Sequence, residues 1–396
     1  MAAAPRLIIV ADDLTGAMDV AGPLASRGRS TWVVATVDGC TLATLPAADV
    51  VSINADSRHL SEERAALRVR SVVRDLVRPD SEILIKKIDS TLRGNVVVET
   101  LAMLEASGRR AAVVAPAFPR QGRTVIEGAV HVDGIALKDT NFARDALAPP
   151  PLEPLHALFR RADARVDVVS VGRGASVVLA PDRRQQIFVV DSMRDEDLRA
   201  TLSTLEGRLR DTLLVGSAGI AEALAEVYFA QTPATFTAPA LQGPLLFVVG
   251  SRTEQSAQQA SALVEGCSAR IVAAPAGSID IGAAARATEG VLVLKATSDG
   301  REGEATEVAR RLAEGAAALL ARLPIAGVVA TGGDTAVAIL QQLSQPTLRV
   351  MGTLLPGIPF SWMQVGGRKV WFVTKAGGFG SRDTFVTIAH RLRGIA

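Results

Sequence analysis

The sequence predicts an α/β protein of two domains, each with a mostly parallel sheet flanked by helices. Short apolar runs alternate with stretches of helical periodicity along almost the whole chain. Runs that are apolar throughout are typical of parallel strands that are buried on both faces. The chain has 396 residues, which is more than one compact core usually covers, so two domains are expected.

The first half alternates strands with helices. Gly28 is a typical C-terminal stop for the first helix, and Ser61, followed by two glutamates, is typical of a helix start. In a doubly wound sheet, the strands at 7–11 and 82–86 are expected to be neighbours. Strands are expected over 7–11, 50–54, 82–86, 111–115, 166–171, 186–191 and 212–216, helices over 15–28, 61–77 and 96–107, and a long loop over 116–124.

A domain boundary is expected near 229–244. This segment is rich in Pro, Thr and Ala and has neither helical nor strand periodicity. It predicts one domain over 1–232, a linker over 233–244 and a second domain over 245–396. The alternation then restarts, with apolar runs in 245–251, 269–274, 290–297, 325–334 and 369–380 and helices expected over 253–265 and 304–322.

The composition argues against several classes of partner. A net charge of +2 and an aromatic content of 4% give no basis for a nucleic-acid surface or an anionic-membrane surface. Cys40 and Cys267 lie far apart, which fits a reducing compartment. The N-terminus lacks the pattern of a signal peptide, and no apolar run of about twenty residues follows. We therefore expect a soluble, cytoplasmic protein with no nucleic-acid or membrane partner.

Charged and polar side chains follow the first four expected strands. In open α/β sheets, ligands bind outside the carboxyl ends of the strands. Cations there can hold a carboxylate, and aspartates can accept hydrogen bonds from hydroxyls. Any one of these residues is more readily a solvated loop residue or a salt-bridge member, but together they predict a site for a small, anionic, hydroxyl-rich ligand. The residues are Asp12 and Asp13, then Asn54, Asp56 and Arg58, then Lys86, Lys87, Asp89, Ser90 and Arg93, and finally Arg120 and Arg123.

Glycine-rich turns mark the second half instead. They lie in 248–255, 330–340, 354–362 and 374–385, each after an apolar run. In the second and fourth, a Gly pair permits close backbone approach and a helix is expected just after, which suits nucleotide phosphates. One Gly pair alone is more often a tight turn. The segment "VGSAG" (215–219) is either a similar site or a close helix–strand contact. Neither GxxxxGK[ST] nor GxGxxG is present, and the four His residues lack metal-ligand spacing.

These blocks resemble the four-carbon acid sugar kinase family. The resemblance runs from residue 7 to about 385 through "ADDLTGAMDVAG", "NADSR", "KKIDSTLRGN", "APAFPRQGRTVIEG", "VGSAG", "VVGSRT", "ATGGDTA" and "TKAGGFGS". It implies ATP-dependent phosphorylation of threonate, erythronate or 3-oxo-tetronate, with Mg²⁺. It also implies an acid-sugar-binding domain first and a nucleotide-binding domain second. The chain departs from the family pattern at Leu355 and in 142–154, so the exact acid is left open.

The resemblance assigns site residues by motif. The expected catalytic base is Asp12, Asp13 or Asp334. Because side chains alternate along extended backbone, one of the first two should face ligand hydroxyls, and the other Mg²⁺ or the lysines. The acid-sugar residues are Asp12, Arg58, Lys86, Lys87, Ile88, Asp89, Ser90 and Arg93. The nucleotide residues are Ser251, Gly332, Gly333, Asp334, Leu355, Pro356, Gly357, Ile358, Gly377 and Gly378.

Two other functions fit parts of the pattern. A nicotinamide-dependent hydroxy-acid dehydrogenase would place its cofactor on the glycine turns, although the absence of GxGxxG argues against it. A sugar-acid-binding regulator would use the charged rim without needing the glycine turns. Release of ADP on addition of four-carbon acids separates all three. Metal ligands are not assigned, and a homodimer is compatible with the sequence.

Overall fold

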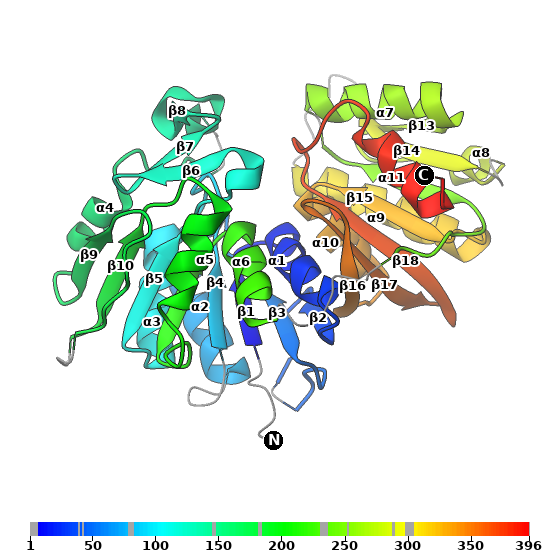
Figure 1. The fold of residues 1–396 in the computed structure, drawn as a ribbon. Coiled ribbons are helices and arrows are strands. Elements are labelled where there is room, and N and C mark those ends of the chain that lie inside the picture. Colours follow the sequence, from blue (N-terminus) through cyan, green and yellow to red (C-terminus); the bar gives the residue numbers. More distant parts are fainter. Residues whose placement is uncertain are drawn as a thin grey trace. The chain divides into compact units, whose positions relative to one another are not determined.

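The computed structural model describes residues 7–38, 40–41, 43–77, 83–144, 148–180, 184–229, 237–251, 253–286, 290–297 and 305–395. The chain divides into two compact units, Met1–Ala234 and Thr235–Ala396, and each is described by itself. Residues 233–236 of the expected linker lie outside the described residues. Both units are built on sheets flanked by helices, which confirms the predicted fold class (Figure 1).

The N-terminal unit contains a parallel sheet in the order β2-β3-β1-β4-β11-β5-β10-β9. The first and third predicted strands, β1 and β4, are neighbours as expected. Strand β2 was not predicted, because its apolar run is only four residues long. The strands are β1 (Leu7–Ala11), β2 (Thr31–Val34), β3 (Val50–Asn54), β4 (Ile83–Lys87), β5 (Ala111–Ala115), β9 (Asp167–Val171), β10 (Gln186–Val190) and β11 (Thr212–Gly216).

Helices form two layers on this sheet. One layer joins α1, α6 and α5 by direct contacts, and the other joins α2, α3 and α4 (Figure 1). Helix α2 begins directly after Ser61, as predicted, although the serine hydroxyl makes no capping bond. The central strands are buried along their whole length. The helices are α1 (Leu14–Ser26), α2 (Glu62–Leu76), α3 (Val96–Ser107), α4 (Leu155–Ala162), α5 (Asp195–Ser203) and α6 (Ala218–Tyr228).

The long loop expected at 116–124 is the start of a small antiparallel sheet. After the 3₁₀ turn η1 (Pro119–Gln121), strands β6 (Arg123–Ile126), β7 (Ala129–Val132) and β8 (Ile135–Ala136) pair in sequence. Figure 1 shows this sheet beyond the carboxyl ends of the parallel strands. Two further 3₁₀ turns follow, η2 (Leu137–Asp139) and η3 (Asn141–Arg144). The strands are too short for their alternation to be recognised in the sequence.

The C-terminal unit has a mixed sheet in the order β13-β14-β12-β15-β18-β17-β16. Its first five strands are parallel, and the last two form an unpredicted antiparallel hairpin beside β18. The strands are β12 (Leu245–Val249), β13 (Arg270–Pro275), β14 (Val291–Thr297), β15 (Gly327–Thr331), β16 (Thr347–Leu355), β17 (Ile358–Val365) and β18 (Arg368–Lys375), and the helices are α7 (Glu254–Cys267), α8 (Ile281–Ala285), α9 (Ala305–Arg322), α10 (Gly333–Gln342) and α11 (Thr384–Arg393).

Each unit has its own core. In the N-terminal unit it is formed by the β-branched residues of the sheet and the inner faces of its helices. In the C-terminal unit the aromatic rings of Phe247 and Phe385 meet at 5.3 Å, so α11 is fixed against β12. Within the described residues, none of the helices is long and apolar enough to cross a membrane.

Candidate active site

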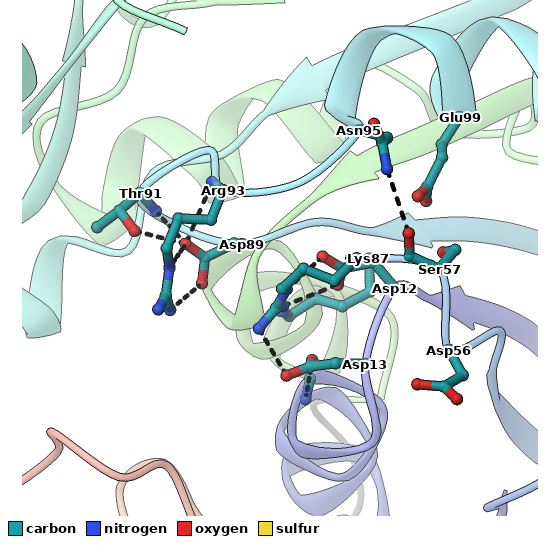
Figure 2. A network of polar contacts seen from close by, with 12 residues as sticks. Asp12, Asp13, Asp56, Ser57, Lys87, Asp89, Thr91, Arg93, Asn95 and Glu99 are labelled. Atoms are coloured by element: carbon teal, nitrogen blue, oxygen red, sulfur yellow. Dashed lines mark hydrogen bonds and ion pairs between the residues drawn. The ribbon is translucent and has the colours of Figure 1, made fainter. Parts of the chain in front are cut away.

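Three adjacent strands, β3, β1 and β4, end at the same level and bring the first set of predicted residues together. The register places Ala11 between Asn54 and Lys87. Asp12 follows β1, Arg58 lies in the loop after β3, and Asp89 lies in the loop after β4. Figure 2 shows Asp12, Asp13 and Asp89 in one close-up, with the hydrogen bonds and ion pairs of this region as dashed lines. Three of the four expected loops therefore form one polar cluster at the carboxyl ends of the strands.

Arg58 lies between the two adjacent aspartates. Its Nε and Nη2 donate to the two carboxylate oxygens of Asp12, at 2.7 and 2.9 Å, and its Nη1 donates to Asp13 at 2.6 Å. One guanidinium thus spans both carboxylates, because it has donors on two edges. The expectation that one aspartate faces ligand hydroxyls and the other Mg²⁺ or the lysines stays a prediction. Asp13 also accepts a 2.8 Å hydrogen bond from Gly16 N and caps α1.

The two aspartates differ in exposure. The Asp12 side chain is 4% exposed and that of Asp13 is 21% exposed. Burial alone would raise the pKa of Asp12, but the Arg58 guanidinium, with help from the two lysines, holds it below its usual value. Asp12 is thus a fixed anion with both oxygens engaged, whereas Asp13 is the more accessible carboxylate.

The lysine pair of "KKIDS" splits across the sheet. Successive side chains of a strand point to opposite faces, and Lys86 faces α3, where its Nζ pairs with Glu99 at 2.7 Å. Both side chains are buried, at 0% and 1% exposure. Burial raises the pKa of Glu99, and Lys86 opposes that rise. Lys86 therefore stabilises the interior of the sheet and offers no open cation to a ligand.

Lys87 points to the other face, toward α1. A Cβ at Gly16 would lie 2.9 Å from Lys87 Nζ, so the absence of a side chain at Gly16 allows the lysine to approach the helix. No described residue forms a hydrogen bond or ion pair with the ammonium of Lys87. Its charge is offset only at longer range, by the carboxylates of Asp12 and Asp19. Because a buried charge without a direct partner is costly, this is the cation of the cluster that most needs an anionic ligand.

The loop after β4 is organised by Asp89. Its carboxylate accepts hydrogen bonds from the hydroxyl of Thr91 at 2.5 Å and from Arg93 Nε and Nη2 at 2.8 and 3.0 Å. Burial would raise the pKa of Asp89, but Arg93 and Arg58 together hold it well below its usual range. The Asp89 carboxylate therefore fixes the conformation of the loop and holds the guanidinium of Arg93.

The remaining residues of that stretch have separate roles. The Ile88 side chain is 1% exposed and packs in the core, so only its backbone could reach a ligand, while Ser90 is half-buried. Leu92 and Gly94 both have positive φ, 59° and 85°. A Cβ at Gly94 would lie 3.1 Å from the Arg58 side chain. Glycine therefore allows this loop to turn tightly against Arg58.

Two residues of the cluster were missed by sequence reasoning. Glu99 lies on α3 and pairs with Lys86, and Asn95 Nδ2 donates to the carbonyls of Ser57 and Leu60 at 3.2 and 2.9 Å. Asn95 thereby holds the loop that carries Arg58 (Figure 2). A glutamate that lies one turn into an otherwise apolar helix, "NVVVETLAML", was the available signal.

The arginines after β5 do not join the cluster, because β11 lies between β5 and β4. Arg120 pairs with Asp195, Glu222 and Glu226 at 2.7, 3.1 and 2.9 Å. Arg123 lies over the Phe142 ring and donates to the carbonyl of Gln121. The "VGSAG" glycines allow close packing of α6: a Cβ at Gly216 would lie 3.0 Å from the Ile220 side chain of that helix, and a Cβ at Gly219 would lie 2.3 Å from the carbonyl oxygen of Ala117, which follows β5.

Glu222→Gln is expected to stabilise the protein above pH 7. Burial raises the pKa of Glu222 to about 7, and Asp19, Asp195 and Glu226 add to the rise while Arg120 opposes it. The folded state therefore binds this proton more tightly, and stability is lost as the pH rises from about 4.5 to about 7. Glutamine does not titrate, so the gain should be about 1–2 kcal/mol at pH 8 and vanish near pH 4.

Urea unfolding across this pH range measures the effect, and Glu226→Gln is its matched control. Arg199 and Arg120 outweigh burial and lower the pKa of Glu226, so its loss should destabilise the protein at pH 8. Equal effects of the two variants at pH 8 would contradict the assignment.

The residues predicted to bind the nucleotide lie in the C-terminal unit, at the carboxyl ends of its parallel strands. The register aligns Val249, Thr331 and Lys375 at the ends of β12, β15 and β18. The segments with Ser251, with Gly332–Asp334 and with Gly377–Gly378 follow these three ends.

Direct contacts join these segments. Gly332 N donates to the carbonyl of Lys375 at 2.9 Å, and a Cβ at Gly377 would lie 2.7 Å from Ser251 Oγ. As predicted, a helix begins at Gly333, after Gly332 with φ 99°. Asp334 is exposed in the first turn of that helix.

Two details differ from the expected glycine turns. Leu355 ends β16 and Ile358 begins β17, so Pro356 and Gly357 form the turn of a hairpin. This turn reaches the same edge because β17 runs antiparallel to β18, and a Cβ at Gly357 would lie 3.0 Å from the Phe379 ring. After Gly377–Gly378, the next helix begins only at Thr384. That glycine pair therefore belongs to an irregular loop, which we call the 376–381 loop.

Comparison with known proteins assigns the chain to a family. A family model described as a sugar-binding N-terminal domain matches residues 7–224, and one described as a nucleotide-binding C-terminal domain matches residues 246–385. The chain belongs to the four-carbon acid sugar kinase family. This confirms the resemblance carried by the motifs.

Several relatives match this chain over nearly its whole length. The D-threonate kinase of Bordetella bronchiseptica is 34% identical, and the match covers 98% of each chain. The D-erythronate kinase of Heliobacterium modesticaldum is 28% identical, with 98% of this chain and 97% of the relative covered. A crystal structure of a Salmonella typhimurium LT2 protein matches with a TM-score of 0.76 at 22% identity, over 97% and 98% of the two chains, and shows the shared fold.

Proposed function

We propose that this protein is an ATP-dependent kinase that phosphorylates the terminal hydroxyl of a four-carbon sugar acid of the threonate, erythronate or 3-oxo-tetronate type. The observation that carries the proposal is the different chemistry of two strand-end sites. The N-terminal unit carries a charged cluster around Asp12, Arg58 and Lys87. The C-terminal unit carries glycine turns at the ends of three adjacent strands. Similarity to kinases of such acids supports the same division.

The acid would bind at the charged cluster. Lys87, whose ammonium has no partner among the described residues, is the leading cation for the acid's carboxylate. Described residues use three of the five N–H groups of Arg58, so this guanidinium mainly fixes the two aspartates. Asp12 and Asp13 would accept hydrogen bonds from the hydroxyls of the acid.

In the proposed reaction, the terminal hydroxyl oxygen forms a bond to the γ-phosphorus of ATP, and the bond to the β,γ-bridging oxygen breaks to release ADP. Asp13, the more accessible carboxylate, would take the hydroxyl proton. Such transfer depends mainly on positioning and charge neutralisation. The glycine turns would hold the phosphates through backbone N–H groups.

Mg²⁺ would neutralise charge on the phosphates, as in other kinases. The described residues contain no group of three His, Cys, Asp or Glu side chains arranged for a metal. In kinase sites, Mg²⁺ usually binds the substrate phosphates and only one or two protein carboxylates. Exposed Asp334, in the first turn of α10, would be such a carboxylate.

The test is ADP release on addition of a panel of four-carbon acids. We expect release that depends on both ATP and one acid of the panel, with the phosphorylated position read by ³¹P and ¹³C NMR. Reduction of NAD⁺ or NADP⁺ by an acid would instead support a dehydrogenase. Acid binding without turnover would support a regulator.

Gly378→Val is expected to abolish nucleotide binding without unfolding the protein. No described atom lies within 4 Å of a Cβ at Gly378, so the fold has room for a side chain there that a phosphate would meet. Calorimetry with ADP should show at least a hundredfold loss of affinity, an order of magnitude set by the loss of several charge-assisted hydrogen bonds. Gly172→Val is the matched control, because that Cβ position is equally open. Normal ADP binding by the Gly378 variant would place the phosphates elsewhere.

A further inference from the structure

Lys375, which ends β18, is a buried cation that binds the backbone of the 376–381 loop. Its side chain is among the fully buried ones. Its Nζ donates to the carbonyls of Ala376, Gly377 and Phe379 at 2.7, 3.1 and 2.8 Å. The Phe385 ring lies 5.5 Å from the same nitrogen. An ammonium has three donors, and here each one points to a carbonyl of a single loop.

The same loop is bound by polar side chains of α7. Gln255 donates to the carbonyl of Gly380 at 2.7 Å, and Ser256 donates to that of Gly377 at 2.8 Å. Gln259 donates to the carbonyls of Phe379 and Ser381 at 2.9 and 2.8 Å. Together with Lys375, these residues draw the carbonyl side of the loop toward the protein.

This arrangement determines where the N–H groups of the loop point. In a trans peptide group, the C=O of one residue and the N–H of the next point in opposite directions. The carbonyls of Ala376, Gly377 and Phe379 point inward. The N–H groups of the residues that follow them, Gly377, Gly378 and Gly380, therefore point outward. No described residue accepts a hydrogen bond from these three N–H groups. Outward N–H groups on successive residues, here Gly377 and Gly378, form a concave site for an anion. The N–H of Phe379, which precedes Gly380, instead bonds to the carbonyl of Ala376.

We propose that Lys375 is a positioning residue that turns the N–H groups of the 376–381 loop toward a nucleotide phosphate. The inference rests on the proposed function, because it assigns the phosphates of ATP to this loop. It also gives a role to a buried cation that has no carboxylate partner among the described residues. Burial is costly for this charge and lowers the pKa of Lys375 to about 8. Methionine would fill the same space but would leave the three carbonyls unbound.

Lys375→Met tests the proposal, with Lys369→Met as control. Lys369 is an exposed lysine of the same strand. We expect the KM for ATP and the Kd for ADP to rise about tenfold to a hundredfold, as hydrogen bonds to charged groups allow. The KM for the acid should stay unchanged. Adenosine, which has no phosphate, should bind the variant and the wild type equally when measured by NMR.

The outcomes separate the two hypotheses. If the wild-type protein binds no nucleotide, the proposed function itself fails. If the wild type binds ADP and folded Lys375→Met binds it equally well, only the role of Lys375 fails. Equal losses for ADP and adenosine would show a general structural role and would also overturn it. If Lys375→Met does not fold, Gln255→Ala and Ser256→Ala, which each remove one carbonyl bond, must weaken ADP binding more than adenosine binding.

Discussion

Replacing Lys86 with methionine is expected to destabilise the N-terminal unit by about 3–5 kcal/mol, the usual cost of removing one partner of a buried ion pair. Lys86 and Glu99 are almost completely buried and lie 2.7 Å apart. Without the lysine, Glu99 would have to keep an uncompensated charge or take up a proton. Chemical unfolding at pH 8, where the carboxylate would otherwise be charged, measures the loss.

The double variant Lys86→Met, Glu99→Leu should recover most of that stability. Replacing a buried ion pair by apolar side chains of similar volume is often neutral or stabilising, so we expect it within about 1.5 kcal/mol of the wild type. The double-mutant cycle then isolates the pair interaction. A Lys86→Met protein as stable as the wild type would contradict the ion pair.

The same double variant tests the ligand role predicted for Lys86. If the lysine only supports the sheet, the double variant should keep a KM for the acid close to that of the wild type. A large rise in this KM at normal stability would return Lys86 to the acid site.

The division of labour between the two lysines could not be predicted from the sequence. Alternation along β4 implies that Lys86 and Lys87 point to opposite faces, but not which face is closed. That depends on Glu99, whose place opposite Lys86 follows from the packing of α3. In contrast, the strand ends were predictable, because β1, β3 and β4 are continuous apolar runs that end at polar residues.

The C-terminal site shows the same limit. The glycines of "ATGGDTA" and "TKAGGFGS" indicated backbone approach, and the structure aligns both at the ends of β15 and β18. The buried position of Lys375 was not evident, because a lysine before two glycines is usually read as a solvent-exposed loop residue. Its three carbonyl partners come from the path of the loop itself, and sequence periodicity contains no information about that path.

Asp13→Asn is expected to lower kcat about 10²–10⁴-fold while the KM for the acid changes little. General-base catalysis contributes a factor of this size. We propose Asp13 as the base of the pair because its side chain is 21% exposed, against 4% for Asp12, and because Arg58 holds both oxygens of Asp12. The lowered pKa of Asp12 makes it a weaker base still. Steady-state kinetics with the acid identified from the panel measures the change.

Asparagine at this position removes the charge but keeps the hydrogen bond that caps α1. Asp13 Oδ1 accepts the Gly16 N–H, and an asparagine oxygen serves equally well there, so a fall in kcat would not come from a frayed helix. Asp12→Asn is the matched control. It removes the charge of Asp12 and one of the two hydrogen bonds by which Asp12 orients Arg58, so it should mainly raise the KM for the acid. If both variants keep wild-type kcat, the N-terminal aspartates only support the site. Exposed Asp334 is then the remaining candidate for the base.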